Sequence, residues 1–135
     1  MSKSALYVVN TSSQQIEVNG IISPGTIVRR FGPNLGLAGN AIQVAGAGYY
    51  EFNASITAAA TAAGEVTVTM YKDGIPLQGA TASETAAAGG DYVNISLSAI
   101  VREFCSCCDG LSNFTFVLTG IESTITNIAI TVEKL

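Results

Sequence analysis

The chain has 135 residues, enough for one compact domain with its own hydrophobic core and short for two. Apolar residues make up 48% of it, but charged residues only 12%, about half of the ~25% that is usual in soluble domains. The net charge of −4 includes no basic stripe of the kind that binds nucleic acid, and no apolar run approaches the ~18 residues of a transmembrane helix. We therefore expect one domain over residues 1–135, with no nucleic-acid partner and no membrane insertion.

Ten segments are predicted as β-strands, because they are short, often alternate apolar and polar residues, and lie between turn-forming residues. In chain order they are 6–10, 15–18, 26–31, 41–45, 49–59, 65–71, 79–86, 92–102, 113–118 and 126–133. The turn signals between them include Asn19-Gly20 and Asp73-Gly74, whose residues tolerate the positive φ of hairpin turns. No segment has a helical period, and residues 58–63 are interpreted as a strand end and loop. This pattern predicts an all-β sandwich or jelly roll.

The clearest alternation lies between residues 48 and 76, which form two predicted strands and the Asp73-Gly74 turn. One face of these strands carries only apolar side chains, namely Tyr50, Phe52, Ala54 and Ile56, followed by Val66, Val68 and Met70. By contrast, residues 32–39 superficially resemble a phosphate-binding loop but lack its Gly-Lys-Ser/Thr ending, so we interpret them as a turn-rich connection.

Several motifs occur in an order that resembles a known superfamily. The segment Gly48-Tyr49-Tyr50-Glu51-Phe52 is similar to a Gly-x-Tyr-x-Phe core strand, and residues 66–76 are similar to the hairpin that follows it. Residues 91–95, 114–118 and 128–133 are similar to the later strands. Together, over roughly residues 40–135, they resemble the C1q/TNF-like jelly-roll superfamily, specifically bacterial or phage C1q-like domains. The resemblance implies a ten-stranded jelly-roll sandwich that packs as a tight homotrimer. The sequence lacks the collagen-like stalk and any Asp-x-Asp calcium pattern.

The scarcity of charge independently indicates self-association. A small domain has a large surface for its volume and usually covers that surface with charged side chains. Since the cores of protein interfaces are depleted in charge, burial against copies of the same chain accounts for the composition. The alternative is a secreted or surface protein with an ordinary Thr, Ser and Asn exterior.

Three cysteines, Cys105, Cys107 and Cys108, form the one unusual local cluster. In an extended segment Cys105 and Cys107 share a face, and one chain lacks the fourth ligand of a closed zinc site. Three interpretations stay open: reduced thiols used as small apolar residues, disulfides, or a metal site shared around a trimer axis. We expect no cofactor.

Catalytic chemistry is poorly represented, because the chain has no histidine and so cannot form a Ser-His-Asp or Cys-His arrangement. The carboxylates of Glu17, Glu51, Glu65 and Glu133 fall on the polar side of predicted strands, where solvation is the ordinary explanation. We expect a protein that is not an enzyme, although a jelly roll does not by itself exclude a hydrolase.

The leading hypothesis is therefore a trimeric structural or assembly protein of a phage virion or of a bacterial cell or spore surface, with other virion or surface-layer proteins as partners. The alternative is a carbohydrate- or host-receptor-binding fibre tip, with Tyr49, Tyr71 and Tyr92 as candidate stacking residues. Cross-strand aromatic pairing is the more ordinary explanation of these tyrosines, since such pairs routinely stabilise sheets. The apolar part of the N-terminus is about five residues long, too short for a secretory signal. We expect synthesis in the cytoplasm and release by lysis or assembly, or a mature form whose signal was removed.

Overall fold

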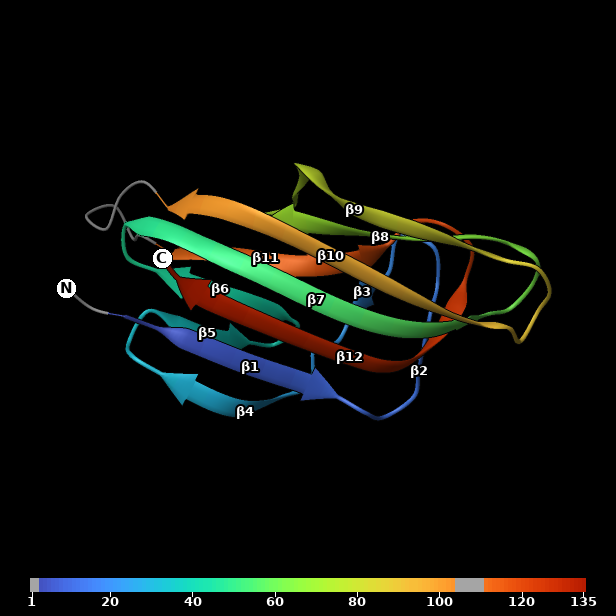
Figure 1. Cartoon of the computed structure of the whole chain (residues 1–135), viewed down its shortest axis with the longest axis horizontal. Helices are drawn as coiled ribbons and strands as arrows, with labels where there is room; N and C mark the ends of the chain where they lie inside the picture. The colour runs from blue at the N-terminus through green and yellow to red at the C-terminus, as the bar shows by residue number, and fades with distance from the viewer. Residues whose placement is uncertain (1–2, 104–110) are drawn as a thin grey trace.

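The computed structural model describes residues 3–103 and 111–135, which form twelve β-strands (Figure 1). The strands are β1 (Ala5–Asn10), β2 (Gln14–Ile16), β3 (Ile21–Ile22), β4 (Thr26–Phe31), β5 (Leu35–Ala38), β6 (Ala41–Ala45), β7 (Gly48–Ala60), β8 (Gly64–Lys72), β9 (Ile75–Ala86), β10 (Tyr92–Glu103), β11 (Leu111–Leu118) and β12 (Ser123–Lys134). Within the described ranges there is no helix, as the absence of a helical period predicted.

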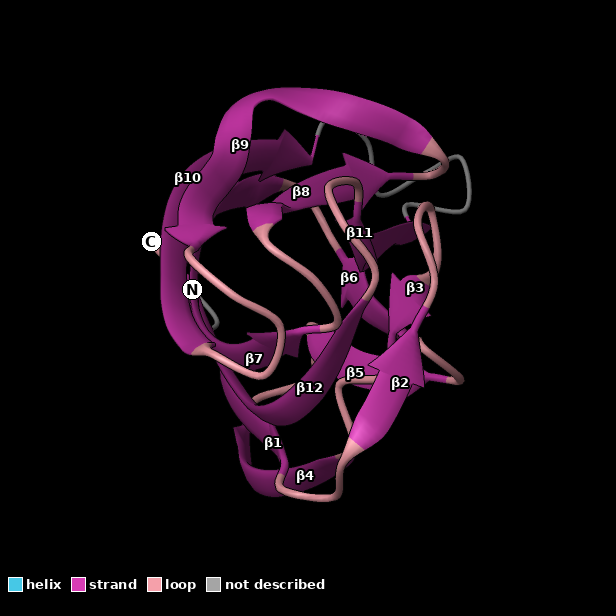
Figure 2. Cartoon of the chain, turned by 90° about the vertical axis from the view of Figure 1, so that its right-hand side faces the viewer, coloured by secondary structure: helices cyan, strands magenta, loops and turns pink. Residues whose placement is uncertain are grey.

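The strands form two antiparallel sheets that face each other (Figure 2). Sheet A has the order β10-β7-β12-β1-β4, with β2 added beside β12. Sheet B has the order β5-β6-β11-β8-β9, with β3 added beside β11. Neighbouring strands are mostly not consecutive in the chain, and the first long strand, β1, pairs with the last, β12. Such crossovers between two sheets are the topology of a jelly roll, so the predicted fold class is confirmed.

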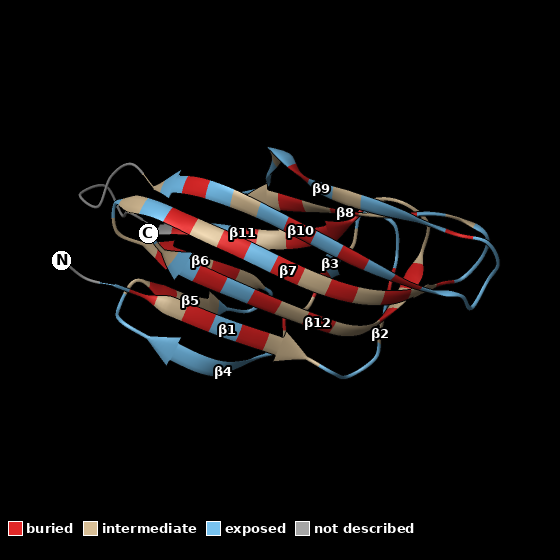
Figure 3. Ribbon diagram, viewed as in Figure 1, coloured by how far each residue is buried: buried red, intermediate tan, exposed pale blue. Residues whose placement is uncertain are grey.

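The core fills the space between the sheets. Along β7 and β8 buried and more exposed residues alternate, as the sequence predicted (Figure 3). The buried residues of both sheets form one hydrophobic cluster. Phe52 of sheet A meets Phe114 of sheet B with ring centroids 4.7 Å apart and planes tilted by 41°. Both rings are buried, so this pair is a direct apolar contact that holds the two sheets together.

The hairpin between β8 and β9 has the predicted turn. Asp73 and Gly74 have φ values of 50° and 85°, and positive φ at both central residues is typical of a type I′ turn. The Asp73 carboxylate Oδ1 accepts a hydrogen bond of 2.8 Å from the backbone N–H of Asn113, which ties the turn to β11. The next strand, β9, begins at Ile75 and not at residue 79, because Pro76 is tolerated in this edge strand of sheet B.

Two short strands were not predicted. β3 has two residues, too few to show a period, and β5 lies inside the segment that we interpreted as a turn-rich connection. That interpretation of residues 32–39 is wrong for residues 35–38, which form β5; Leu35 is 1% exposed and pairs in register with Val44. Four residues that include a glycine give no readable alternation, so β5 depends on its pairing with β6 more than on its own sequence.

Polar contacts close the end of the sandwich where β6 turns into β7. Asn34 accepts a hydrogen bond of 2.8 Å from the Ser4 hydroxyl and donates one of 2.6 Å to the Ala45 carbonyl. The buried Tyr50 hydroxyl donates to the Gly46 carbonyl at 2.9 Å. Burial, together with the nearby carboxylate of Glu103, raises the pKa of Tyr50 above its ordinary 10.0.

We predict that Phe52→Ala destabilises the fold by about 3–5 kcal/mol, because it opens a cavity between the sheets beside Phe114. Urea unfolding followed by fluorescence or circular dichroism measures the change. Tyr92, which is 70% exposed, supplies the control, since Tyr92→Ala should shift the free energy of unfolding by less than about 0.5 kcal/mol. Equal losses in the two variants would contradict a core centred on Phe52.

A second prediction concerns alkaline pH. Because the pKa of Tyr50 is higher in the folded than in the unfolded chain, its contribution to stability is complete below pH 10 and is lost as pH rises through the folded-state pKa. Tyr50→Phe should cost about 1 kcal/mol at pH 7 through lost hydrogen bonds. The gap between wild type and variant should narrow above pH 10. Unfolding curves at pH 7 to 11 test this, and a gap that stays constant would argue against the raised pKa.

Candidate functional site

The outer face of sheet A carries a continuous patch of small uncharged side chains, here called the neutral face. Register places Asn53 of β7 between Ser98 of β10 and Thr131 of β12, and places Ser55 between Ser96 and Ala129. The row beyond these adds Asn94, Thr57 and Asn127. These adjacent positions on three long strands thus carry no charge and no bulky side chain.

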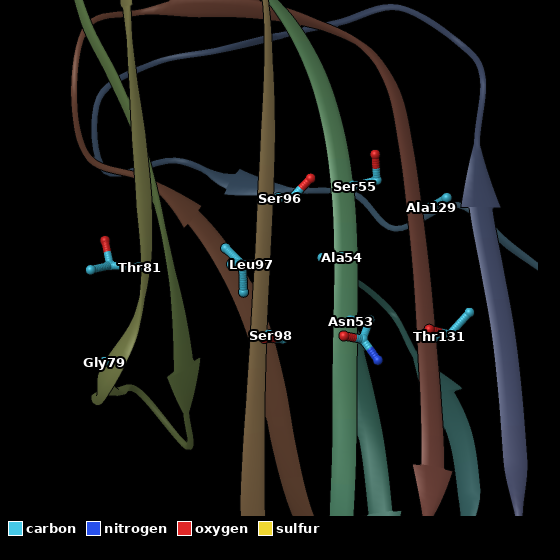
Figure 4. A pocket seen from close by; sticks show the side chains of 10 residues that line it. All are labelled: Asn53, Ala54, Ser55, Gly79, Thr81, Ser96, Leu97, Ser98, Ala129 and Thr131. Atoms are coloured by element: carbon cyan, nitrogen blue, oxygen red, sulfur yellow. The ribbon is translucent and has the colours of Figure 1, made fainter.

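The neutral face contains a depression, and Figure 4 shows the residues that line it. This depression of about 630 Å³ lies over β7, β10 and β12, and Gly79 and Thr81 of β9 form one wall of it. The wall exists because β9, the edge strand of sheet B, lies beside β10, the edge strand of sheet A (Figures 1 and 4). The depression is lined by serine and threonine hydroxyls, by the Asn53 amide and by the apolar residues Ala54, Leu97 and Ala129, so it suits neutral contacts.

The polar atoms of the neutral face differ from those of sheet B in their hydrogen bonds. On the outside of sheet B the hydroxyls of Thr67 and Ser83 bond to each other at 2.8 Å, and those of Thr69 and Thr81 at 2.9 Å. On the neutral face, within the described ranges, only the Asn94 amide makes such a cross-strand bond, to the Thr57 hydroxyl at 3.3 Å. The neutral face therefore keeps its hydrogen-bonding capacity for water or for another molecule.

A second depression on the same side of sheet A, here called the β1–β4 groove, has a volume of about 440 Å³. It runs over β12, β1 and β4 and is lined by Ala5, Leu6, Tyr7, Arg29, Arg30, Phe31, Thr131, Val132 and Glu133. Tyr7 and Phe31 supply its apolar walls and are 37% and 65% exposed. Exposed apolar side chains beside an uncharged sheet are typical of a surface that binds another protein.

The three candidate stacking tyrosines do not gather in one place. Tyr49 and Tyr92 lie at opposite ends of the β7–β10 ladder, ten residues apart along β10 and hence roughly 33 Å apart. Tyr71 lies on β8, in the other sheet. The guanidinium of Arg102 stands 5.6 Å from the centre of the Tyr49 ring, a cation–π contact within sheet A. The carbohydrate hypothesis stays a prediction, without a shared aromatic platform among these residues.

The cysteine cluster, Cys105, Cys107 and Cys108, lies outside the described residues. In the described part of the chain no three side chains of His, Cys, Asp or Glu come together as metal ligands do. Among the four glutamates singled out from the sequence, Glu17, Glu65 and Glu133 are exposed and Glu51 is half-buried. They lie on different strands or loops, and only Glu51 and Glu133 are cross-strand neighbours.

The charges are divided between the two ends of the sandwich. All six lysines and arginines lie toward the end that holds both described chain ends (Figure 1): Lys3, Arg29, Arg30, Lys72, Arg102 and Lys134. The opposite end carries the carboxylates of Glu17, Glu65, Glu84, Asp91 and Glu122. Backbone hydrogen bonds hold its loops together, since Thr61 N–H donates to Glu122 O and Ile121 N–H donates to Glu65 O. One end of the sandwich thus carries both basic and acidic side chains, and the other end carries only acidic ones among its described charged residues.

No helix in the part of the chain that the structure describes has the length and apolar character needed to cross a bilayer. No family model and no curated protein matches the sequence. Solved structures do match over nearly the whole chain. Murine APRIL covers 98% of this chain and 99% of its own, with 12% identity and a TM-score of 0.74. The globular domain of zebrafish complement 1qA covers 97% and 95%, with 9% identity and a TM-score of 0.68.

A viral protein has the same architecture. The vertex protein P5 of the phage PRD1 covers 98% of this chain and 96% of its own, with 18% identity and a TM-score of 0.61. The two domains above and this vertex protein share the jelly-roll fold. The chain therefore has the C1q/TNF-like jelly-roll fold, as the order of its sequence motifs indicated.

Proposed function

We propose that this protein is a non-enzymatic, homotrimeric structural or assembly protein of a phage virion or of a bacterial cell or spore surface. The observation that carries the proposal is the neutral face of sheet A. In an isolated molecule this face would be an unusually uncharged surface in contact with water; in an oligomer it becomes the interface.

The composition of the neutral face fits burial between copies. Charged side chains are costly to bury unless each is paired, and this face has none at its centre. Small side chains such as Ser55 and Ala129 let two flat sheets approach closely, and the hydroxyls and amides left without protein partners can bond across an interface. Sheet B satisfies its threonine ladder internally, so it is the less suitable face.

We propose three subunits because the C1q/TNF-like resemblance implies a homotrimer, and the shared fold supports this number. The phage vertex protein among the similar structures supports a place in a virion. A trimer presents three equivalent sets of loops at fixed spacing, so weak contacts to neighbouring virion or surface-layer proteins combine into firm attachment. The mechanism is shape and multivalency, and it needs no catalytic residue.

We predict a particle of three times the 13.9 kDa chain mass at micromolar concentration. Native mass spectrometry and multi-angle light scattering measure it directly. The trimer should persist in about 1 M salt, because the neutral face contains no ion pair for salt to screen. A stable monomer under these conditions would refute the proposed function.

A charge placed in the neutral face should prevent assembly. We predict that Ser98→Asp weakens each interface by about 3–5 kcal/mol, because the new carboxylate would be buried without a partner. Ser83→Asp, on the outer side of sheet B, is the matched control and should remain trimeric. Analytical ultracentrifugation compares the two variants, and circular dichroism confirms that both are folded. Dissociation of the control alone would move the interface to sheet B.

A further inference from the structure

One exposed apolar side chain on the outer face of sheet A projects from its β10 side. Ile100 is 63% exposed, and its cross-strand partner on β7 is Glu51. Isoleucine is among the residues most often buried in proteins. A solvent-exposed isoleucine at the edge of an uncharged face therefore suggests that another molecule covers it. Among the described residues, its own sheet leaves most of this side chain uncovered.

The β1–β4 groove lies on the same face of sheet A, at the opposite edge, and at the same position along the strands as Ile100. Strand register runs from Ile100 to Glu51, then to Glu133, to Ala5 and finally to Phe31, in one row across sheet A. Three of these residues, Ala5, Phe31 and Glu133, line the groove. A projecting side chain and an apolar hollow therefore occupy the two ends of a single row.

This arrangement suits a ring of copies. Suppose that a second copy is generated by rotation about an axis parallel to the strands. The rotation turns the sheet to face another direction, but each row of paired residues keeps its position along the axis. The edge with Ile100 in one copy then meets the edge with the groove in the next copy. Repeating this head-to-tail contact gives a closed ring when the rotation between copies divides a full turn into equal parts. The three-fold axis of the proposed function meets this condition.

The charges beside the two features are complementary. The groove is lined by two arginines, Arg29 and Arg30, and by one carboxylate, Glu133, so its net charge is positive. Glu51 stands next to Ile100. Within the described residues neither Arg29 nor Glu51 makes an ion pair or a side-chain hydrogen bond. The side chains of Arg29 and Glu51 are therefore available for an ion pair with another copy.

We infer that Ile100 of one copy docks into the β1–β4 groove of the neighbouring copy, between Tyr7 and Phe31, with Glu51 facing Arg29. This inference rests on the proposed trimer and names the contact that closes it. Its occupant is a second copy of this chain, because Ile100 and the groove lie at one height. The carboxylate of Glu51 beside Ile100 is also opposite in sign to the net positive charge of the groove.

A charge-swap rescue tests the contact. Ile100→Glu alone and Phe31→Arg alone should each raise the dissociation constant of an interface about 30-fold. The Ile100→Glu/Phe31→Arg double variant should recover most of that loss, since the two new charges would meet across the interface. Ile75, which is 69% exposed and lies on β9 of sheet B, provides the matched control, and Ile75→Glu should assemble as wild type does. Sedimentation velocity over a concentration series measures all five proteins.

The outcomes separate this inference from the proposed function. If wild type is a trimer but the double variant is no better than the two single variants combined, the trimer stands and the docking contact is overturned. Normal assembly of Ile100→Glu would overturn the docking contact as well. If wild type is itself monomeric, the proposed function fails, and the docking contact fails with it. Rescue in the double variant, with an unaffected Ile75→Glu, supports both.

Discussion

The whole structure depends on burying one apolar face of each sheet against the other. Phe52 and Phe114 meet across that layer, and the alternating side chains of β7, β8 and β12 fill the space around them. The chain has few charges and no described helix to cover a sheet from outside, so the inner faces account for nearly all the hydrophobic stabilisation. About every second residue of β7, β8 and β10 is committed to that layer, whereas β9 at the edge of sheet B buries only Ala80 and Ala86. The remaining residues, on the outer faces, are then free to serve another purpose.

At the centre of the outer side of sheet A these free positions carry serine, threonine, asparagine and alanine, whereas on sheet B the hydroxyls are bonded to each other. The difference gives the sandwich two unlike sides although both are uncharged at their centres. An interface on sheet A uses the central strands β7 and β12, each of which is paired on both sides. Assembly would then build on the most extensively paired part of the molecule, and the loops at both ends would remain outside the contact.

Much of the fold could be predicted from the sequence, for reasons that the structure makes clear. Residues 49–59 and 65–71 alternate so regularly that only a strand with one dry face satisfies them, and Asp73-Gly74 specifies its turn locally. Pairing between β1 and β12 is different, because it joins opposite ends of the chain and leaves no trace in either segment. The same limit applies to β5, which is a strand only because β6 lies beside it.

The candidate site shows the same division. The scarcity of charge predicted that part of the outer surface is buried against other copies. It did not predict which sheet provides that surface, because this depends on the register between β7, β10 and β12. The tyrosines were identified by residue type alone, and register then separated Tyr49 from Tyr92 by the length of a strand. Alternation along its strand places Ile100 on the polar side, with Ser96 and Ser98. An isoleucine in a predicted strand is ordinarily assigned to the core, however, so its exposure became evident only in the structure.

The division of charge between the two ends of the sandwich has a consequence for any assembly that keeps its copies parallel. Each molecule carries basic groups only toward one end, so the individual dipoles add and the particle acquires a defined electrical direction. Two such particles repel when their acidic loops approach and are drawn together end to end. Near a charged surface, within the ~8 Å over which charges act at physiological salt, such a particle would be turned so that its end of opposite charge makes contact.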